Sequence, residues 1–324
     1  MGNTRPKRRM TVRIGIGLVA FVLLLFAACL FIPGTVEYAD FPVEPFDKIL
    51  SQEEIHEKLT ALNRQFEQNG LDYLVFDPKK LMQGEILWKK EDIEGDFFFQ
   101  YWGENAEGKL RIRLLKNTGD LVSLSFRPKR KPDKKYETGK GEDSFEDLLR
   151  KIAGSLPPGL QLADYERRPN QLTTLRWERT HLGYPCLNIG NENCEFYLLI
   201  DSYNQIQSFY KEWRTLPDHV DVNIGPIEAI MAMCAVKRDL TEKKMTDSLT
   251  KSIYVPTRMK LAFVPPNGFF VGPTQKTPWW PLSERRLAWV FELKKFPYRS
   301  PMTTFASVLD IYIDAETGRC IGAP

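Results

Sequence analysis

Few side chains in this sequence have the types and spacing that catalysis or metal binding requires. The chain has three histidines, His56, His181 and His219, and they stand far apart in the sequence. None has a cysteine, serine or carboxylate at a motif spacing, and no zinc-protease, nucleophile-elbow, phosphate-loop or dinucleotide-binding pattern occurs. We therefore predict no catalytic, cofactor-binding or metal-binding residues, and we expect each histidine to be a surface residue or a hydrogen-bonded partner. A pair of carboxylates that only the fold brings together stays open as an acid–base site.

The cysteines offer one candidate disulfide, between Cys186 and Cys194. The segment between them, Leu-Asn-Ile-Gly-Asn-Glu-Asn, has turn-forming residue types at 190–193 and predicts a hairpin loop. In a hairpin centred on Gly190 the two cysteines would face each other, so a disulfide is geometrically feasible. Spacing alone does not prove pairing, and two reduced, half-buried thiols are an equal alternative. Cys234 lies in an apolar helical stretch, and we expect it in the core.

A long segment at residues 265–286 is rich in proline and aromatic residues. If this segment is exposed, its aromatic side chains would form a partner-binding surface. The alternative is that they fold back over the open face of the neighbouring sheet, because large exposed apolar patches are rare on monomers. The candidate partner-binding residues are Phe269, Phe270, Trp279 and Trp280. Four other tryptophans lie in predicted strands and are expected in the core: Trp102, Trp177, Trp213 and Trp289.

The N-terminus has the pattern of a single transmembrane helix. Residues 14–32 are 19 consecutive residues without a charge, and at about 1.5 Å per residue they nearly match a hydrocarbon core of about 30 Å. Residues 1–13 contain five basic and no acidic residues, and acidic residues follow the apolar run. The positive-inside rule therefore places residues 1–13 in the cytoplasm and everything after the span outside.

A cleaved signal peptide and a lipidated Cys29 are the alternatives for this segment. A signal peptide usually has a shorter apolar run of about 7–15 residues, and the run here continues past Cys29. Both observations favour one continuous span at residues 14–32. We therefore predict a single-pass protein of the cell membrane with extracytoplasmic C-terminal domains.

The charge of the chain argues against nucleic acid as a partner. The sequence has 45 basic and 42 acidic residues, a formal net charge of +3. Because five of the basic residues belong to residues 1–13, the remainder has 40 basic against 42 acidic residues, a net charge of −2. A near-neutral ectodomain lacks the overall positive charge that favours binding to a phosphate backbone.

After a proline-containing stalk at residues 33–50, the pattern predicts three units, each a helix followed by antiparallel strands. Ser51 and Glu54 have the spacing of a capping box and open the first helix. A similar pattern at Ser144 opens the second helix, and Pro226 occupies the first position of the third. Strands are predicted at 73–76, 96–102, 109–115, 121–126, 161–166, 172–180, 184–189, 194–200, 205–213, 253–255, 259–264, 287–294 and 305–313.

These units form a loose internal repeat and give an α+β fold class. Gly119, Asn204 and Gly318 occupy equivalent turns between strands, and each is a residue type that tolerates positive φ. A lone helix on three or four strands can bury one face of the sheet. The predicted boundaries are 51–126 for repeat 1, 144–216 for repeat 2 and 217–324 for repeat 3 with its inserted loop at 265–286. In the third helix, the apolar residues at helical spacing on one face are Ile227, Ile230, Met231, Cys234 and Ala235.

Residues 127–143, RPKRKPDKKYETGKGED, form a charged run that contains proline and glycine. One interpretation is a basic docking patch, and the other is a solvated linker between repeats 1 and 2. The linker is favoured, because such runs are usually exposed and irregular.

The last repeat resembles a PepSY-type module. Residues 287–293, LAWVFEL, are similar to the first strand of that pattern, and residues 308–318, VLDIYIDAETG, are similar to its second strand and turn. Residues 176–185, RWERTHLGYP, and the hairpin at 198–213 resemble the YcdB/YcdC-type repeats of Gram-positive cell envelopes. The resemblance covers roughly residues 144–324, and repeat 1 fits only by its plan of a helix followed by strands.

The resemblance implies tandem PepSY-like modules in an extracytoplasmic, membrane-linked protein without catalytic residues or cofactors. Members of the family are associated with inhibition of secreted peptidases or with regulation of envelope processes. The expected function is therefore a non-enzymatic binding or regulatory protein that inhibits or modulates a peptidase or an envelope enzyme. A short tail, one span and an external tandem also resemble accessory regulators of two-component sensor kinases of the YycH/YycI type, which gives the alternative function. An envelope hydrolase with an unrecognised site is the third hypothesis.

Overall fold

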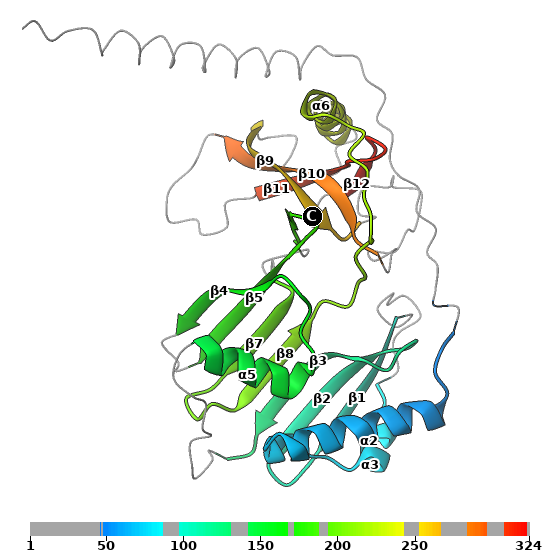
Figure 1. Cartoon of the computed structure of the whole chain (residues 1–324), viewed down its shortest axis with the longest axis vertical. Helices are drawn as coiled ribbons and strands as arrows, with labels where there is room; N and C mark the ends of the chain where they lie inside the picture. Colours follow the sequence, from blue (N-terminus) through cyan, green and yellow to red (C-terminus); the bar gives the residue numbers. More distant parts are fainter. Residues whose placement is uncertain are drawn as a thin grey trace, which may run out of the picture. The chain divides into compact units, whose positions relative to one another are not determined.

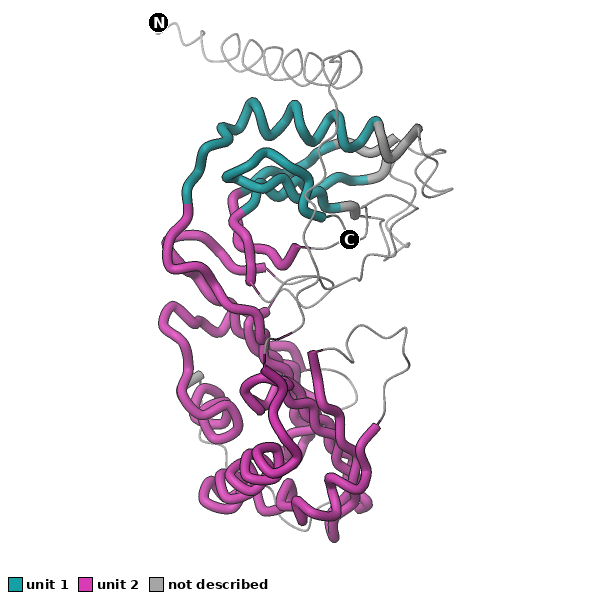
Figure 2. Tube along the Cα trace, turned by 90° about the vertical axis from the view of Figure 1, so that its right-hand side faces the viewer, with its two compact units in different colours: residues 1–39, 221–260, 288–323 teal, residues 40–220, 261–287, 324 magenta. Residues whose placement is uncertain are grey.

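The computed structural model describes residues 46, 48–86, 97–130, 142–167, 172–187, 194–242, 253–266, 284–296 and 308–322. The predicted tail and span lie outside these residues, as do most of the stalk, most of the linker and the middle of the 265–286 loop. Among the helices that the structure describes, none has both the length and the apolarity of a membrane span. The chain divides into two compact units, coloured separately in Figure 2. The larger unit takes its described residues from 40–220 and 261–287, and the smaller from 221–260 and 288–323.

One antiparallel sheet forms the frame of the larger unit (Figure 1). In the described part of the chain it has eight strands, of which the short β6 (Tyr184–Pro185) pairs only with β5. The other strands lie side by side in the order β1 (Phe98–Glu104), β2 (Gly108–Leu115), β3 (Leu121–Pro128), β8 (Ile206–Lys211), β7 (Phe196–Ile200), β5 (Thr173–His181) and β4 (Leu160–Arg167). Helices and an antiparallel sheet confirm the predicted α+β class.

Repeats 1 and 2 share this single sheet. β3 closes the first meander and β8 closes the second, and the two strands pair with each other through Ser123↔Tyr210 and Ser125↔Ser208. The predicted turns precede both strands: Gly119 has φ +71° before β3, and Asn204 has φ +64° before β8. Each repeat therefore contributes its last strand to the junction, which removes one exposed edge from each meander.

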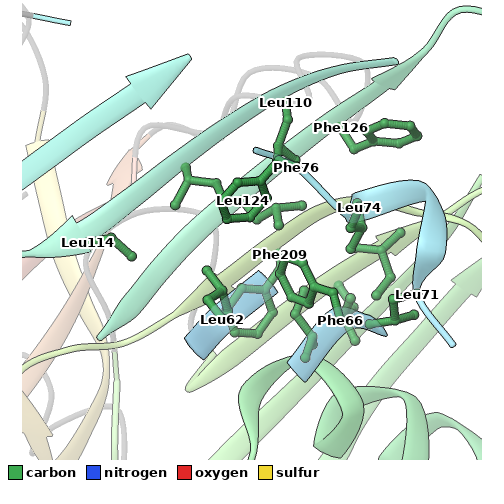
Figure 3. Packing of buried hydrophobic residues seen from close by; sticks show 14 of the residues in the cluster. Leu62, Phe66, Leu71, Leu74, Phe76, Leu110, Leu114, Leu124, Phe126 and Phe209 are labelled. Carbon is green, nitrogen blue, oxygen red and sulfur yellow. The ribbon is translucent and has the colours of Figure 1, made fainter. Parts of the chain in front are cut away.

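Three helices cover one face of the sheet: α2 (Gln52–Gln68), α3 (Pro78–Gln83) and α5 (Glu142–Ala153). α2 begins with the predicted capping box, in which the Ser51 hydroxyl accepts from the Glu54 N–H at 3.2 Å and the Glu54 carboxylate accepts from the Ser51 N–H at 2.7 Å. Figure 3 shows Leu62 and Phe66 of α2 among the strand residues of the core, near Phe209 of β8. This layer is the hydrophobic core of the larger unit.

The opposite face of the same sheet, which we call the helix-free face, has no helix on it within the described residues. One end of this face holds a small aromatic cluster in which Phe46 and Phe97 pack on Trp213, with ring centroids 6.2 Å and 5.3 Å from that of Trp213. On β1 and β2 this face also carries polar side chains. Cross-strand pairs place Gln100 opposite Arg113 and Trp102 opposite Arg111.

The smaller unit is a helix on a four-stranded sheet. Its strands lie in the order β12 (Cys320–Gly322), β11 (Val308–Asp314), β10 (Arg286–Phe296) and β9 (Ile253–Val264), and α6 (Pro226–Glu242) packs against β11 and β12. The predicted turn before β12 is present. Asp314 Oδ1 accepts from the N–H groups of Glu316 and Thr317 at 3.0 Å and 2.8 Å, and Gly318 has φ +74°.

Several local predictions were wrong. Residues 73–76 form no strand, because the short helix η1 (Asp72–Leu74) turns the chain so that Tyr73 and Leu74 enter the core. Ser144 is no helix cap, since α5 already begins at Glu142. The predicted strands at 253–255 and 259–264 are one strand, β9. Of the predicted strand at 184–189, the described residues 184–187 form only the two-residue β6.

The core assignments were only partly right. Trp177 is buried as predicted, Trp213 and Trp289 are half-buried, and Trp102 is 44% exposed on the helix-free face. In α6 the residues that are buried are Ala229, Met233, Cys234, Ala235 and Val236. The predicted face therefore holds for Cys234 and Ala235 and fails for Ile227 and Met231, which are exposed. α6 is apolar on two sides, so its period alone does not tell which side meets the sheet.

Candidate functional site

The three histidines lie in different parts of the larger unit. His56 is half-buried on α2, and its backbone oxygen accepts from the Thr60 hydroxyl at 2.8 Å. His181 ends β5, where Nε2 lies 2.8 Å from the Pro217 carbonyl oxygen and the ring packs on Phe263. His219 lies in the segment after β8. Within the described ranges, no group of three or more histidine, cysteine or acidic residues has the arrangement of a metal site.

The candidate disulfide is not formed in the structure. Cys186 and Cys194 are both buried thiols in the structure, and both are more deeply buried than the half-buried state expected. Burial raises the pKa of the Cys186 thiol, against the opposing effect of the Arg285 charge beside it. Both thiols border a group of buried charges that the sequence did not predict.

This buried charge cluster consists of Arg179, Glu195, Glu212, Arg214 and Arg285 in the larger unit. Arg285 Nη2 lies 2.6 Å from Glu195 Oε2, and Arg179 Nη1 lies 3.5 Å from Glu195 Oε1. Arg214 Nη1 lies 2.9 Å from Glu212 Oε1, and the Tyr210 hydroxyl donates to Glu212 Oε2 at 3.2 Å. The side chain of Arg285 is 0% exposed, so its ion pair with Glu195 is strongly desolvated.

Ion pairing shifts the pKa values of Glu212 and Arg285 in the direction that favours their charged forms. Burial alone would raise the pKa of the Glu212 carboxyl, but the charges of Arg214 and Arg285 outweigh burial and hold that pKa below its usual range. Burial would likewise lower the pKa of Arg285, but Glu195 and Glu212 raise it. Burial, together with the neighbouring Glu212 charge, raises the pKa of Tyr210 well above its usual value. The shifts of Glu212, Arg285 and Tyr210 all favour the protonation states usual at neutral pH, so the cluster has the character of a structural contact.

The buried charge cluster and nearby backbone hydrogen bonds connect the two ends of the inserted segment to the second repeat. Arg285 lies inside the loop predicted at 265–286, 90 residues from Glu195 along the chain. The backbone N–H of Arg285 donates to the backbone oxygen of Thr215 at 2.9 Å, and the backbone N–H of Leu187 donates to the backbone oxygen of Phe263 at 2.7 Å. The burial of Arg285 could not be predicted from the sequence, because its partner Glu195 lies far away along the chain.

The four candidate partner-binding aromatics, Phe269, Phe270, Trp279 and Trp280, lie outside the described residues. The structure offers another apolar surface, on the smaller unit. Ile227 is 71% exposed and Met231 is 43% exposed, and they lie four positions apart on α6, so both project from one side of the helix. We call Ile227 and Met231 the α6 patch.

Hydrogen bonds hold the start of α6, the helix that carries the α6 patch. The N–H groups of Asn223 and Ile224 donate to the Ala315 oxygen at 3.0 Å and 2.9 Å, and the Trp289 indole N–H donates to the Ile224 oxygen at 2.8 Å. The turn before β12 and strand β10 therefore fix the start of α6. Two large apolar side chains held this way are suited to bind a partner without first being ordered.

A second arrangement in the smaller unit is a pair of carboxyl groups. Glu292 of β10 stands directly opposite Asp310 of β11. Burial and the Glu292 charge raise the pKa of Asp310, and Lys260 partly offsets them. Glu292 also binds Lys294 Nζ at 3.1 Å. With a cation already bound to one carboxylate, the pair has the chemistry of a charged surface cluster.

Comparisons with known proteins add only remote similarities. No protein-family model matches the chain, and no curated protein matches its sequence. Among solved structures, the chain is similar to the C-terminal domain of YpeB from Bacillus megaterium, with 10% identity, a TM-score of 0.33 and coverage of 86% of this chain and 98% of that one. It is also similar to an uncharacterised protein from Eubacterium rectale, with 9% identity, a TM-score of 0.31 and coverage of 88% and 85%. At such TM-scores neither similarity supports an argument about fold or function.

Proposed function

We propose that this chain is a non-enzymatic, extracytoplasmic binding protein, anchored in the cell membrane by residues 14–32, that inhibits or modulates a peptidase or another envelope enzyme. The observation that supports a binding role best is the α6 patch. Large apolar side chains left exposed on a rigid element are typical of interaction sites. Apolar residues four apart on a helix are also the anchors with which a helix enters a groove of its partner.

The anchor and the partner class have separate supports. The uncharged run at residues 14–32, with basic residues before it and acidic residues after it, supports a single span with the two units outside. The PepSY-type resemblance of residues 287–293 and 308–318 supports a peptidase or envelope enzyme as the target. These strands are the ones that position α6.

Site-directed photo-crosslinking in cells that make the full chain tests this function. A photoreactive residue at position 227 should form an adduct with the target enzyme, and the same residue at position 61, an exposed site on α2, should not. Met231→Asp should reduce the adduct at position 227 by roughly tenfold, since loss of a well-buried interface contact costs about 1.4 kcal/mol. Equal adducts at both positions would contradict the proposal.

The alternative function, an accessory regulator of a sensor kinase, is favoured by the same apolar run, because such a regulator would contact the kinase through its membrane helix. Replacing residues 14–32 by an unrelated span of equal length separates the two functions. The α6 adduct should persist in that chimera if the external units bind the target. A signalling phenotype that disappears with the native span would support the kinase function instead.

A further inference from the structure

The helix-free face of β1 to β3 carries an excess of positive charge. Cross-strand pairs place Glu104 opposite Lys109, and Lys109 opposite Arg127. Arg111 and Arg113 point to the same side of β2 as Lys109, because successive residues of a strand alternate between its faces. On these three described strands the face thus holds four basic side chains, Lys109, Arg111, Arg113 and Arg127, against one carboxylate, Glu104.

The fold itself gains little from this arrangement. Lys109 and Arg127 are directly opposite each other, and like charges at such positions destabilise a sheet. Arg111 Nη2 and Arg113 Nε each donate to Oε1 of Gln100 at 2.7 Å, which holds both guanidinium groups on this face. The Glu104 carboxylate is bound by a further cation, Lys129, at 2.8 Å. On these described strands Lys109 and Arg127 therefore add positive charge that would attract an external anion.

An exposed tryptophan stands among these charges. Trp102 is 44% exposed, and Lys109 Nζ lies 5.7 Å from the centroid of its ring. The neighbouring positions on β3 and β8 are small, Ser125 opposite Ser208, so no large side chain at these positions screens the ring along the sheet. Tryptophan beside basic residues is the combination found where proteins meet the headgroup region of a bilayer.

The short connection between the apolar run and the larger unit favours the anionic headgroups of a bilayer as the bound anion. Sixteen Cα-to-Cα steps lead from Ile32, the end of the apolar run, to Lys48, where the continuously described part of the larger unit begins. Even fully extended, at about 3.5 Å per residue, they reach only about 56 Å. A surface tethered this closely meets the membrane at a high effective concentration. Directly after β3, the described residues Lys129 and Arg130 are also basic.

An acidic polypeptide fits the face less well. Peptides that bind a sheet usually add to its edge, where backbone groups are unpaired, but the backbone groups of β2 are paired on both sides, with β1 and β3. We propose that the helix-free face of β1 to β3 docks on anionic lipid headgroups of the bilayer that anchors the chain. This inference rests on the membrane anchor of the proposed function.

Full-length protein reconstituted into vesicles tests the docking. The vesicles contain brominated phosphatidylcholine, either alone or in an equimolar mixture with phosphatidylglycerol, and bromine quenches tryptophans that reach the acyl boundary. We expect additional quenching in the anionic vesicles only, and its loss in Trp102→Phe. Lys109→Gln with Arg127→Gln should lower the ratio of docked to undocked protein roughly 25-fold, because each basic residue near an anionic surface contributes about fivefold.

Matched controls separate docking from folding. Arg64→Gln with Lys79→Gln removes the same charge from exposed positions on α2 and α3, on the helix-covered side, and should leave the quenching unchanged. The Lys109/Arg127 variant should be at least as resistant to thermal unfolding as the parent, since it removes a like-charge pair.

The possible failures are distinguishable. Flotation in a density gradient shows whether the chain is bound to the vesicles. If the chain floats with both kinds of vesicle but the quenching of Trp102 does not depend on lipid charge or on the Lys109/Arg127 substitutions, the docking is wrong and the anchor stands. If the chain floats with neither, both the anchor and the docking inferred from it are wrong. If soluble polyglutamate changes Trp102 emission while anionic lipid does not, the face binds acidic polypeptides and the membrane proposal is overturned.

Discussion

Replacement of Arg285 by methionine tests whether the buried charge cluster ties the inserted segment to the second repeat. The Arg285 side chain is fully buried and its Nη2 lies 2.6 Å from Glu195 Oε2. Arg285→Met would leave the Glu195 carboxylate buried with only Arg179, at 3.5 Å and 18% exposed, as its cation. Breaking a buried ion pair by removing one partner costs about 3–5 kcal/mol. Because Arg179 remains, we expect a loss near the lower end, about 3 kcal/mol.

The double variant Arg285→Met with Glu195→Leu sharpens this test. Apolar residues that replace both partners of a buried pair are often close to neutral, and the remaining Arg179 can turn toward water. We expect the double variant to lose only about 1 kcal/mol, which makes the two substitutions strongly non-additive. Urea unfolding followed by tryptophan fluorescence measures both values, since Trp177 and Trp213 lie in the larger unit. If Arg285→Met alone lowered the free energy of unfolding by less than about 1 kcal/mol, or if the effects of the two substitutions were additive, the proposed role of the cluster would be wrong.

Three further predictions follow from the perturbed groups. Because the pKa of Glu212 is held low, its ionised form contributes stability above the unfolded pKa of about 4.3, and this contribution disappears as pH falls through the lower native pKa. The Glu212→Gln variant should therefore be less stable at neutral pH, and its stability should depend less on acid pH. Urea unfolding at several pH values measures both effects. The raised pKa of Asp310 means that its ionised form opposes folding, so Asp310→Asn should stabilise the smaller unit at pH 7 by about 0.5 kcal/mol, measured by thermal unfolding. The buried Cys186 thiol, whose pKa is raised, should react with iodoacetamide only as fast as the larger unit opens, and fast labelling of Cys186 in the folded protein would contradict its burial.

Local signals in the sequence predicted the parts of the fold that neighbouring residues control. The capping box at Ser51 and the turns at Gly119, Asn204 and Gly318 all form as expected, because each depends on hydrogen bonds and φ angles within a few residues. The pairing of β3 with β8 was not predictable in this way. It joins residues more than 80 positions apart in sequence, such as Ser123 and Tyr210, and single strands carry little information about non-local partners.

Both surfaces proposed here were missed for the same physical reason. Helical spacing grouped Ile227 with Cys234, although only Cys234 is buried, because an apolar residue type does not say which side of a helix faces a sheet. Strand spacing likewise placed Trp102 in the core, because alternation does not reveal which face of a sheet the helices cover. A sequence therefore predicts that an element has two faces more reliably than it predicts which face is covered.

The two surfaces also belong to different compact units, and this makes their roles separable. The α6 patch is mounted on the strands of the smaller unit, whereas the basic face with Trp102 belongs to the larger unit. If the larger unit docks on lipid and the smaller unit holds the target, charge removal at Lys109 and Arg127 should weaken membrane docking without reducing the crosslink at position 227. Met231→Asp should do the reverse. If either change affected both readouts equally, the two surfaces would have to act on one partner, and the division between an anchoring unit and a binding unit would be wrong.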